Sequence, residues 1–162
     1  MIINSVNSEN INLFSQILIE SAKWLEARDE TMWKENDLTP DELLKRYSIN
    51  DMRICFEDES PVGVFVLQWY DPLFWADLNK YDSGILHKLA ISNKYRGKGY
   101  GKKVIEYAEE ICKNNNVKSL RLNCGTHRPR LRDFYEEAGF KMVDRVFMDN
   151  KDQIRYIKEI KP

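Results

Sequence analysis

Three glycines at alternate positions, Gly97, Gly99 and Gly101, stand between an apolar extended stretch and an amphipathic helical pattern. The apolar side of that pattern is formed by residues at helical spacing: Val104, Ile105, Ala108, Ile111 and Cys112. The glycines therefore lie at or just before a helix N-terminus, where the first backbone N–H groups have no intrahelical partner and the helix dipole is positive. Because glycine has no side chain to block close approach, the main chain can hold an anion there.

Four basic side chains surround these glycines: Arg96, Lys98, Lys102 and Lys103. Together with the helix N-terminus they predict a phosphate-rich ligand. The Walker pattern G-x-x-x-x-G-K-[ST] does not fit, because Lys103 stands where Ser or Thr would hold magnesium. The dinucleotide pattern G-x-G-x-x-G does not fit either, because the glycines alternate strictly.

The pattern that remains is R-x-x-G-x-G, formed by Arg96, Gly99 and Gly101 and preceded by Leu89-Ala90-Ile91. It resembles the acyl-coenzyme A loop of the GNAT superfamily of N-acetyltransferases. The stretch Leu131–Phe140 is similar to the closing helix of that family and to its Y-x-x-x-G-F ending. Glycine–lysine loops also occur as plain helix entries, but two patterns in this order are far more specific than either alone.

The resemblance implies acetyl-CoA as the acyl donor, held between two splayed central strands, here Ser83–Ile91 and Val117–Cys124. It implies that the pantetheine arm pairs with backbone near Leu89, Ala90 and Ile91. The pyrophosphate would lie on the loop that follows Arg96, on the amides of Gly97, Lys98, Gly99, Tyr100, Gly101 and Lys102.

Acetyl transfer to an amine needs a proton acceptor, because an alkylamine with a pKa of about 10 is protonated at neutral pH. The departing thiolate needs a proton donor. The resemblance offers Tyr135 as the acid, because it matches the tyrosine of the closing helix. The alternative is that Tyr135 is only a helix aromatic that packs beside Phe134.

The same resemblance offers His87 as the base. The stretch Ile85–Ile91 is similar to the H-x-H-x-L-A-V stretch of arylalkylamine N-acetyltransferases, with Ile85 in place of the first histidine. A buried strand histidine satisfied by a neighbour is the alternative.

Acids and aromatics fall in the two regions that border the acceptor side in this family: Glu26, Asp29, Glu30, Trp33, Trp69, Asp71 and Trp75. We take Glu26, Trp33, Trp69 and Trp75 as candidate acceptor contacts, because acids and aromatic faces attract a cationic amine. Most of these tryptophans could equally be core residues. Arg128 stands where relatives commonly carry Asn, and Arg128, Arg130 and Arg132 could reach cofactor phosphates or form a solvated face.

The elements that position these residues follow from local patterns. Strands are expected at residues 1–6, 52–56, 62–70, 83–91, 117–124, 140–148 and 153–160, and helices after Asn10, after Thr39, after the glycines and at residues 129–138. This order matches an α/β GNAT fold of the α+β type. We expect one domain over residues 1–162, with a mixed, mostly antiparallel sheet of about seven strands, splayed in the middle and flanked by about four helices.

Composition limits the alternatives. The 162 residues carry 25 basic and 26 acidic side chains, a net charge of −1, so no global field favours nucleic acid. No apolar segment approaches a membrane span and the N-terminus shows no signal peptide, so a cytoplasmic protein without membrane partners is expected. Three cysteines without C-x-x-C pairing suit reduced core thiols, and we expect no metal site.

The sequence therefore predicts an acyl-CoA-dependent N-acetyltransferase that acts directly on a primary amine of a small molecule or peptide, as a monomer or homodimer. One alternative is a catalytically silent acyl-CoA-binding sensor. A nucleic-acid-binding module that uses the basic residues of 94–103 and 121–132 is a second alternative, which the net charge disfavours.

Overall fold

The computed structural model describes residues 1–162, which divide into two compact units. The first unit contains Met1–Leu67 and Lys88–Val104, and the second contains Gln68–His87 and Ile105–Pro162. The chain passes between the units within strand β4 (Gly84–Ile91) and within helix α3 (Tyr100–Asn114). The functional residues predicted above are therefore shared between the two units.

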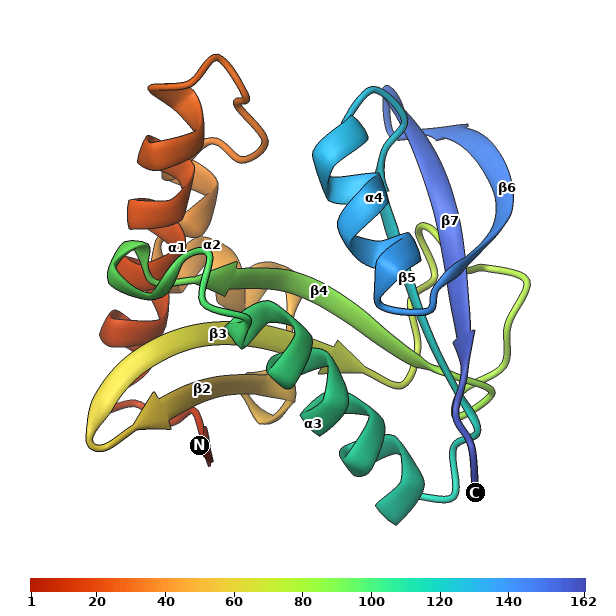
Figure 1. Ribbon diagram of the computed structural model, residues 1–162, viewed down its shortest axis with the longest axis horizontal. Coiled ribbons are helices and arrows are strands. Elements are labelled where there is room, and N and C mark those ends of the chain that lie inside the picture. The colour runs from red at the N-terminus through yellow and green to blue at the C-terminus, as the bar shows by residue number, and fades with distance from the viewer. The chain divides into compact units, whose positions relative to one another are not determined.

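The first unit begins with β1 (Ile2–Ser5) and α1 (Ile11–Glu26), followed by α2 (Pro40–Arg46), β2 (Met52–Glu57) and β3 (Ser60–Gln68) (Figure 1). Strands β1, β2 and β3 pair antiparallel in sequence order. The apolar stripe of α1 packs in one core with residues of β2 and β3, including Phe14, Leu18, Ile54 and Val64, all of which are fully buried. Ala90 of β4 belongs to the same core, so this core also supports the end of β4 that leads into the glycine loop.

Helix α2 shows how local sequence sets an element boundary. Thr39 Oγ1 accepts a hydrogen bond from Glu42 N (3.4 Å), and Pro40 occupies the first helical position. Both features satisfy or remove N–H groups that a helix start leaves without partners. The helix start predicted at Thr39-Pro40 is confirmed.

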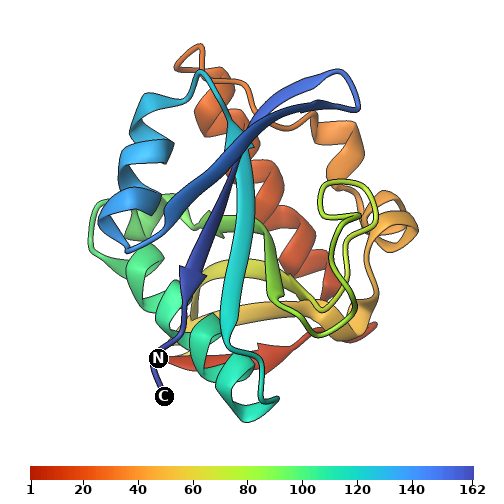
Figure 2. The same cartoon turned by 90° about the vertical axis from the view of Figure 1, so that its right-hand side faces the viewer.

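The second unit contains β5 (Ser119–Gly125), α4 (Pro129–Glu137), β6 (Lys141–Met148) and β7 (Lys151–Glu159). Strand β7 lies between β5 and β6 and pairs antiparallel with both; Figure 2 shows β5 and β7 side by side. At its beginning, β4 pairs parallel with β5, joining Gly84 to Leu120 and Ile85 to Arg121.

The hydrogen-bonded order of the seven strands is β1-β2-β3-β4-β5-β7-β6. Parallel and antiparallel pairings occur in the same sheet, and the chain has four α-helices. The predicted mixed α/β sheet of about seven strands with about four helices is confirmed.

Two hairpin turns are tighter than predicted. We expected a five-residue turn at 57–61, but only Asp58 and Glu59 lie between β2 and β3, both at positive φ (47° and 69°). Pro61 joins β3, beside a register shift at Cys55/Phe56 that accommodates a residue without an N–H. Likewise only residues 149 and 150 separate β6 from β7, again both at positive φ.

Strand β5 begins two residues later than predicted. Asn116 has a positive φ of 58°, and Val117 N donates to Cys112 O (2.9 Å), so both residues close helix α3. None of the helices is long and apolar enough to span a membrane. Three short 3₁₀ helices, at Glu35–Leu38, Ile49–Asp51 and Asn93–Tyr95, were not predicted.

Candidate active site

The glycine loop presents accessible backbone at the start of α3. Gly97 and Gly99 have φ values of +72° and +82°, which side chains disfavour. No heavy atom lies within 4 Å of the position that a Cβ would occupy on either residue, so conformation rather than packing requires glycine here. The helix begins at Tyr100, so Gly101 lies in its first turn. Open space above backbone at a helix N-terminus suits an anionic ligand such as a pyrophosphate.

The Arg96 guanidinium is directed to α1. Its Nη2 donates to Ser21 Oγ and its Nε donates to Asn93 Oδ1, both at 2.9 Å, and its Cζ lies 3.9 Å from the centroid of the Trp24 ring. Burial lowers the pKa of Arg96, which remains charged. Arg28 stacks on the same indole at 3.8 Å, so the two guanidinium groups lie on opposite faces of the ring. These contacts fix the residue before the glycine loop to α1.

The second half of β4 departs from regular strand geometry. Lys88 has a φ of +52°, a left-handed conformation of the kind found at β-bulges, which local sequence did not predict. Its Nζ lies 5.0 Å from the centroid of the Trp33 ring, which is half-buried. A Cβ on Gly63 would approach Ala90 O to 2.8 Å, so glycine there permits close contact with the strand.

His87 directly precedes Lys88 and lies in the second unit, where it contacts a carboxylate. Its Nε2 is 3.1 Å from Asp71 Oδ2, and both side chains are largely buried, with 14% and 8% of their areas exposed. Burial alone raises the pKa of Asp71, but the hydrogen bond and charge of His87, together with the amides of Phe74 and Leu73, lower it below its usual value. Asp71 is therefore a carboxylate at neutral pH.

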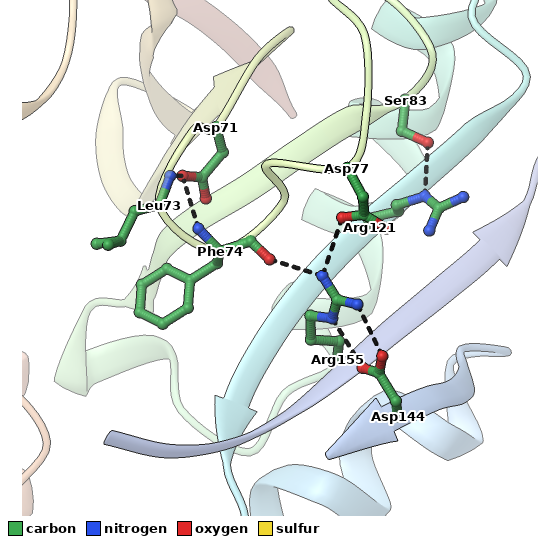
Figure 3. Close-up of polar contacts among 8 residues, drawn as sticks. All are labelled: Asp71, Leu73, Phe74, Asp77, Ser83, Arg121, Asp144 and Arg155. Atoms are coloured by element: carbon green, nitrogen blue, oxygen red, sulfur yellow. Dashed lines mark hydrogen bonds and ion pairs between the residues drawn. The ribbon is translucent and has the colours of Figure 1, made fainter. Parts of the chain in front are cut away.

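The loop that carries Asp71 is fixed by Arg155 on β7 (Figure 3). Arg155 binds both carboxylate oxygens of Asp144 at 2.7 Å, Asp77 Oδ1 at 3.2 Å and Phe74 O at 2.9 Å. Arg155 is itself buried, and its hydrogen bonds to Asp144 raise its pKa. A buried, always-charged guanidinium with three anchors gives this loop a defined position.

Trp75 belongs to the same loop and is fully buried. The guanidinium groups of Arg155 and Arg121 lie 4.5 and 5.0 Å from its ring centroid. The ring also packs with Phe74 and Ile85 in a separate small core. Trp75 is thus enclosed by protein, and we do not retain it as an acceptor contact.

The other candidate acceptor contacts are accessible to different degrees. Trp69 is half-buried and its ring lies 5.6 Å from that of Tyr81. Glu26 is exposed at the end of α1. Both therefore keep surface that a ligand could contact, as does Trp33.

Tyr135 lies on α4 among aromatic rings. Its centroid is 5.2 Å from Phe134, 5.7 Å from Phe140 and 6.5 Å from Tyr156. Burial raises the pKa of Tyr135, so its hydroxyl stays protonated at working pH. A protonated phenol can donate a proton to a stronger base such as a developing thiolate only where the acceptor is close.

The arginines near α4 include one with a clear structural partner. Arg132 Nε donates to Tyr156 Oη (3.1 Å), and this hydrogen bond raises the pKa of Arg132. Its Nη1 donates to Thr126 O (3.3 Å). Arg132 therefore connects α4 to Tyr156 on β7 and to Thr126 in the segment before the helix. These contacts account for the position of its guanidinium without a bound phosphate.

Sequence reasoning missed the contacts of three residues: Trp24, Asp71 and Arg155. The sequence alone places Asp71 among the acids that border the acceptor side. A signal was present, since an aspartate followed by a proline and a turn commonly binds backbone amides. Nothing local indicated its contact with His87.

Residues 16–140 match the sequence profile of the acetyltransferase (GNAT) family. The uncharacterized N-acetyltransferase YesJ of Bacillus subtilis (strain 168) is 27% identical over 149 residues, which cover 83% of this chain and 78% of that protein. A GNAT-family acetyltransferase structure from Listeria monocytogenes 4b F2365 has a TM-score of 0.79 at 19% identity, covering 98% of this chain and 94% of that one. The PaiA N-acetyltransferase of Thermoplasma acidophilum, in complex with coenzyme A, has a TM-score of 0.72 at 21% identity, covering 98% of each chain.

Proposed function

Because the chain belongs to the acetyltransferase (GNAT) family, we propose that it transfers an acetyl group from acetyl-CoA directly to a primary amine. YesJ carries the name of an N-acetyltransferase, and PaiA is an N-acetyltransferase in complex with coenzyme A. These relatives support both the nitrogen acceptor and the donor.

The observation that carries the proposal is the glycine loop. Two left-handed glycines with open space above them precede a 15-residue helix. Lys98 is exposed on the loop and adds positive charge beside those amides. This arrangement suits the pyrophosphate of acetyl-CoA without any metal ligand. The backbone of Leu89, Ala90 and Ile91 would hold the pantetheine arm.

The proposed reaction needs two proton transfers. His87 accepts a proton from the ammonium form of the acceptor, and the neutral amine nitrogen then forms a bond to the thioester carbon. As the carbon–sulfur bond breaks, the Tyr135 hydroxyl donates its proton to the departing sulfur and regains one from the nitrogen through solvent. The products are an amide and the free thiol of coenzyme A.

A cationic amine is the acceptor class that the candidate contacts favour. Glu26 supplies negative charge, and Trp33 and Trp69 supply partly accessible aromatic faces. The Lys88 ammonium lies 5.0 Å from the centroid of the Trp33 ring, so a cationic acceptor would have to displace it or use the opposite face of the ring.

Calorimetric titration with acetyl-CoA, with ATP and NAD as controls, tests the donor. We expect saturable binding of acetyl-CoA and none of ATP or NAD. Equal binding of all three would mean that the glycine loop only begins helix α3 and does not recognise acetyl-CoA. A panel of amines then tests turnover, with acetylated product measured by mass spectrometry. Binding without turnover of any amine would favour the acyl-CoA sensor.

A further inference from the structure

Strand β6 is the last strand of the sheet, and its outer edge has no partner strand. Strand β7 lies between β5 and β6, so β6 is paired on one side only (Figure 1). Three of its side chains are large, apolar and exposed: Met142, Val143 and Phe147, at 51%, 42% and 72% of their areas. An unpaired edge that also exposes apolar side chains is a template for pairing with another strand.

The charges that could protect this edge are neutralised within the chain. Asp144 binds Arg155 of β7 through both carboxylate oxygens at 2.7 Å. Arg145 donates two hydrogen bonds to Asp152, which is also on β7. Free charges on an edge strand oppose the approach of a second strand, but each of these two is paired with an opposite charge on the neighbouring strand. No proline interrupts β6 either.

A β-bulge confines regular pairing to the second half of β6. The register with β7 shifts between Met142 and Asp144, so Val143 has no residue of its own opposite it. Such a bulge twists the strand and interrupts its ladder of hydrogen bonds. The regular stretch that follows, Asp144–Met148, contains Phe147, which is the most exposed of the large apolar residues. The lysine that begins the strand lies before the bulge.

The sequence of β6 is complementary to itself in one register. A two-fold axis pairs two identical strands antiparallel, and the residue on the axis faces its own counterpart. An axis at Asp144 or Arg145 would place like charges opposite each other, which destabilises a pair of strands. An axis at Val146 brings no opposite charges together. An axis at Phe147 places the two phenyl rings together and Arg145 of each copy opposite Asp149 of the other.

We propose that the outer edge of β6 is a self-association surface, on which a second copy of this chain pairs antiparallel about Phe147. Side chains two residues apart share a face of a sheet, so Arg145 and Asp149 flank the apolar contact with an opposite-charge pair at each end. The paired stretch is short and small interfaces are weak, so the dimer dissociates on dilution. The surface contains none of the residues assigned to acetyl transfer, and the inference does not depend on that assignment.

Sedimentation equilibrium tests the association. We expect the average mass to rise from that of one chain toward that of two as the concentration increases to about 100 µM, above the micromolar affinity of weak interfaces. Phe147→Glu should stay monomeric over the same range, because it places two carboxylates on the axis. The matched control is Leu44→Glu, at an exposed leucine of α2, which should associate like the native chain. Thermal unfolding confirms that each variant is folded. A native chain that stays monomeric at the highest concentration, or a Phe147→Glu variant that associates normally, would overturn the inference.

Engineered cysteines test the register. Residues directly opposite each other in an antiparallel pair lie within the Cα separation that a disulfide can bridge. Phe147→Cys should therefore form a disulfide-linked dimer under mild oxidation. Met142→Cys, also exposed on β6 but far from the axis, should not. The three native cysteines are buried and do not compete. Equal cross-linking of the two variants would indicate random collision, and cross-linking of Met142→Cys alone would indicate another register; either result contradicts pairing about Phe147.

Discussion

Replacing Arg96 by lysine separates two roles that this residue could have. The family pattern suggests contact with cofactor phosphates, whereas the structure directs its guanidinium to Ser21, Asn93 and the Trp24 ring. Lysine keeps the positive charge but has neither the planar fork nor the stacking surface. A phosphate contact would therefore survive the change in large part, and the anchor to α1 would not.

The expected loss follows from these contacts. Each hydrogen bond from a charged group contributes about 1.5–3 kcal/mol when buried, and we take about 1 kcal/mol each because Arg96 is only half-buried. The stacking contact adds about 0.5–1 kcal/mol. The sum, about 2.5–3 kcal/mol, corresponds to a decrease in Tm of about 5–12 °C for a chain of this size.

The assay is thermal unfolding of Arg96→Lys and Arg96→Ala, together with calorimetric binding of acetyl-CoA at two salt concentrations. We expect both variants to lose similar stability and to bind acetyl-CoA with similarly raised Kd, because the loop is no longer fixed. The control is Lys98→Ala, an exposed loop residue whose removal should weaken binding in a salt-dependent way without lowering Tm. An Arg96→Lys variant with native Tm and native affinity, beside an Arg96→Ala variant of weak affinity, would refute the anchoring role.

Three further perturbations have defined outcomes. Tyr135→Phe should lower kcat about 10²–10⁴-fold with KM for acetyl-CoA unchanged, and unchanged turnover would remove Tyr135 from the mechanism. Gly99→Ala should raise the Kd of acetyl-CoA, because a side chain at its φ of +82° costs about 1–2 kcal/mol; native affinity in calorimetry would contradict this. Asp71 and Asp144 have pKa values below normal in the folded protein, so their stabilising effect is present above the unfolded value of about 3.9 and is lost as pH falls through the folded values. Tm should therefore fall below about pH 4, and less steeply in Asp144→Asn, where circular dichroism at a series of pH values checks it.

The elements and the glycine loop could be predicted because their causes are local. Helix α3 has its apolar stripe and its glycines within one stretch, and α2 has its cap within four residues. Both hairpin turns were predicted at the right places in the chain, but both were predicted too long. At Asp58-Glu59 the reason is that glutamate rarely adopts positive φ, whereas Asp149 and Asn150 tolerate that conformation.

Side-chain contacts in the candidate site could not be predicted because they join distant parts of the sequence. Arg96 and Ser21 are 75 residues apart, and Arg155 and Phe74 are 81 apart. An arginine beside glycines looks like a phosphate ligand until its partner is known. In the same way, Trp75 among acidic residues resembled a cation-binding surface, whereas in the fold its cations are Arg121 and Arg155.

The three cysteines have a practical consequence for measuring turnover. Cys55, Cys112 and Cys124 are free and buried, and burial raises their pKa values to about 12, 12 and 11. Thiolates are the reactive form, so these groups should be nearly silent toward a disulfide reagent such as Ellman's in the folded protein. Continuous colorimetric detection of liberated coenzyme A then needs no cysteine-free variant, and a rising background in the same cuvette would report unfolding.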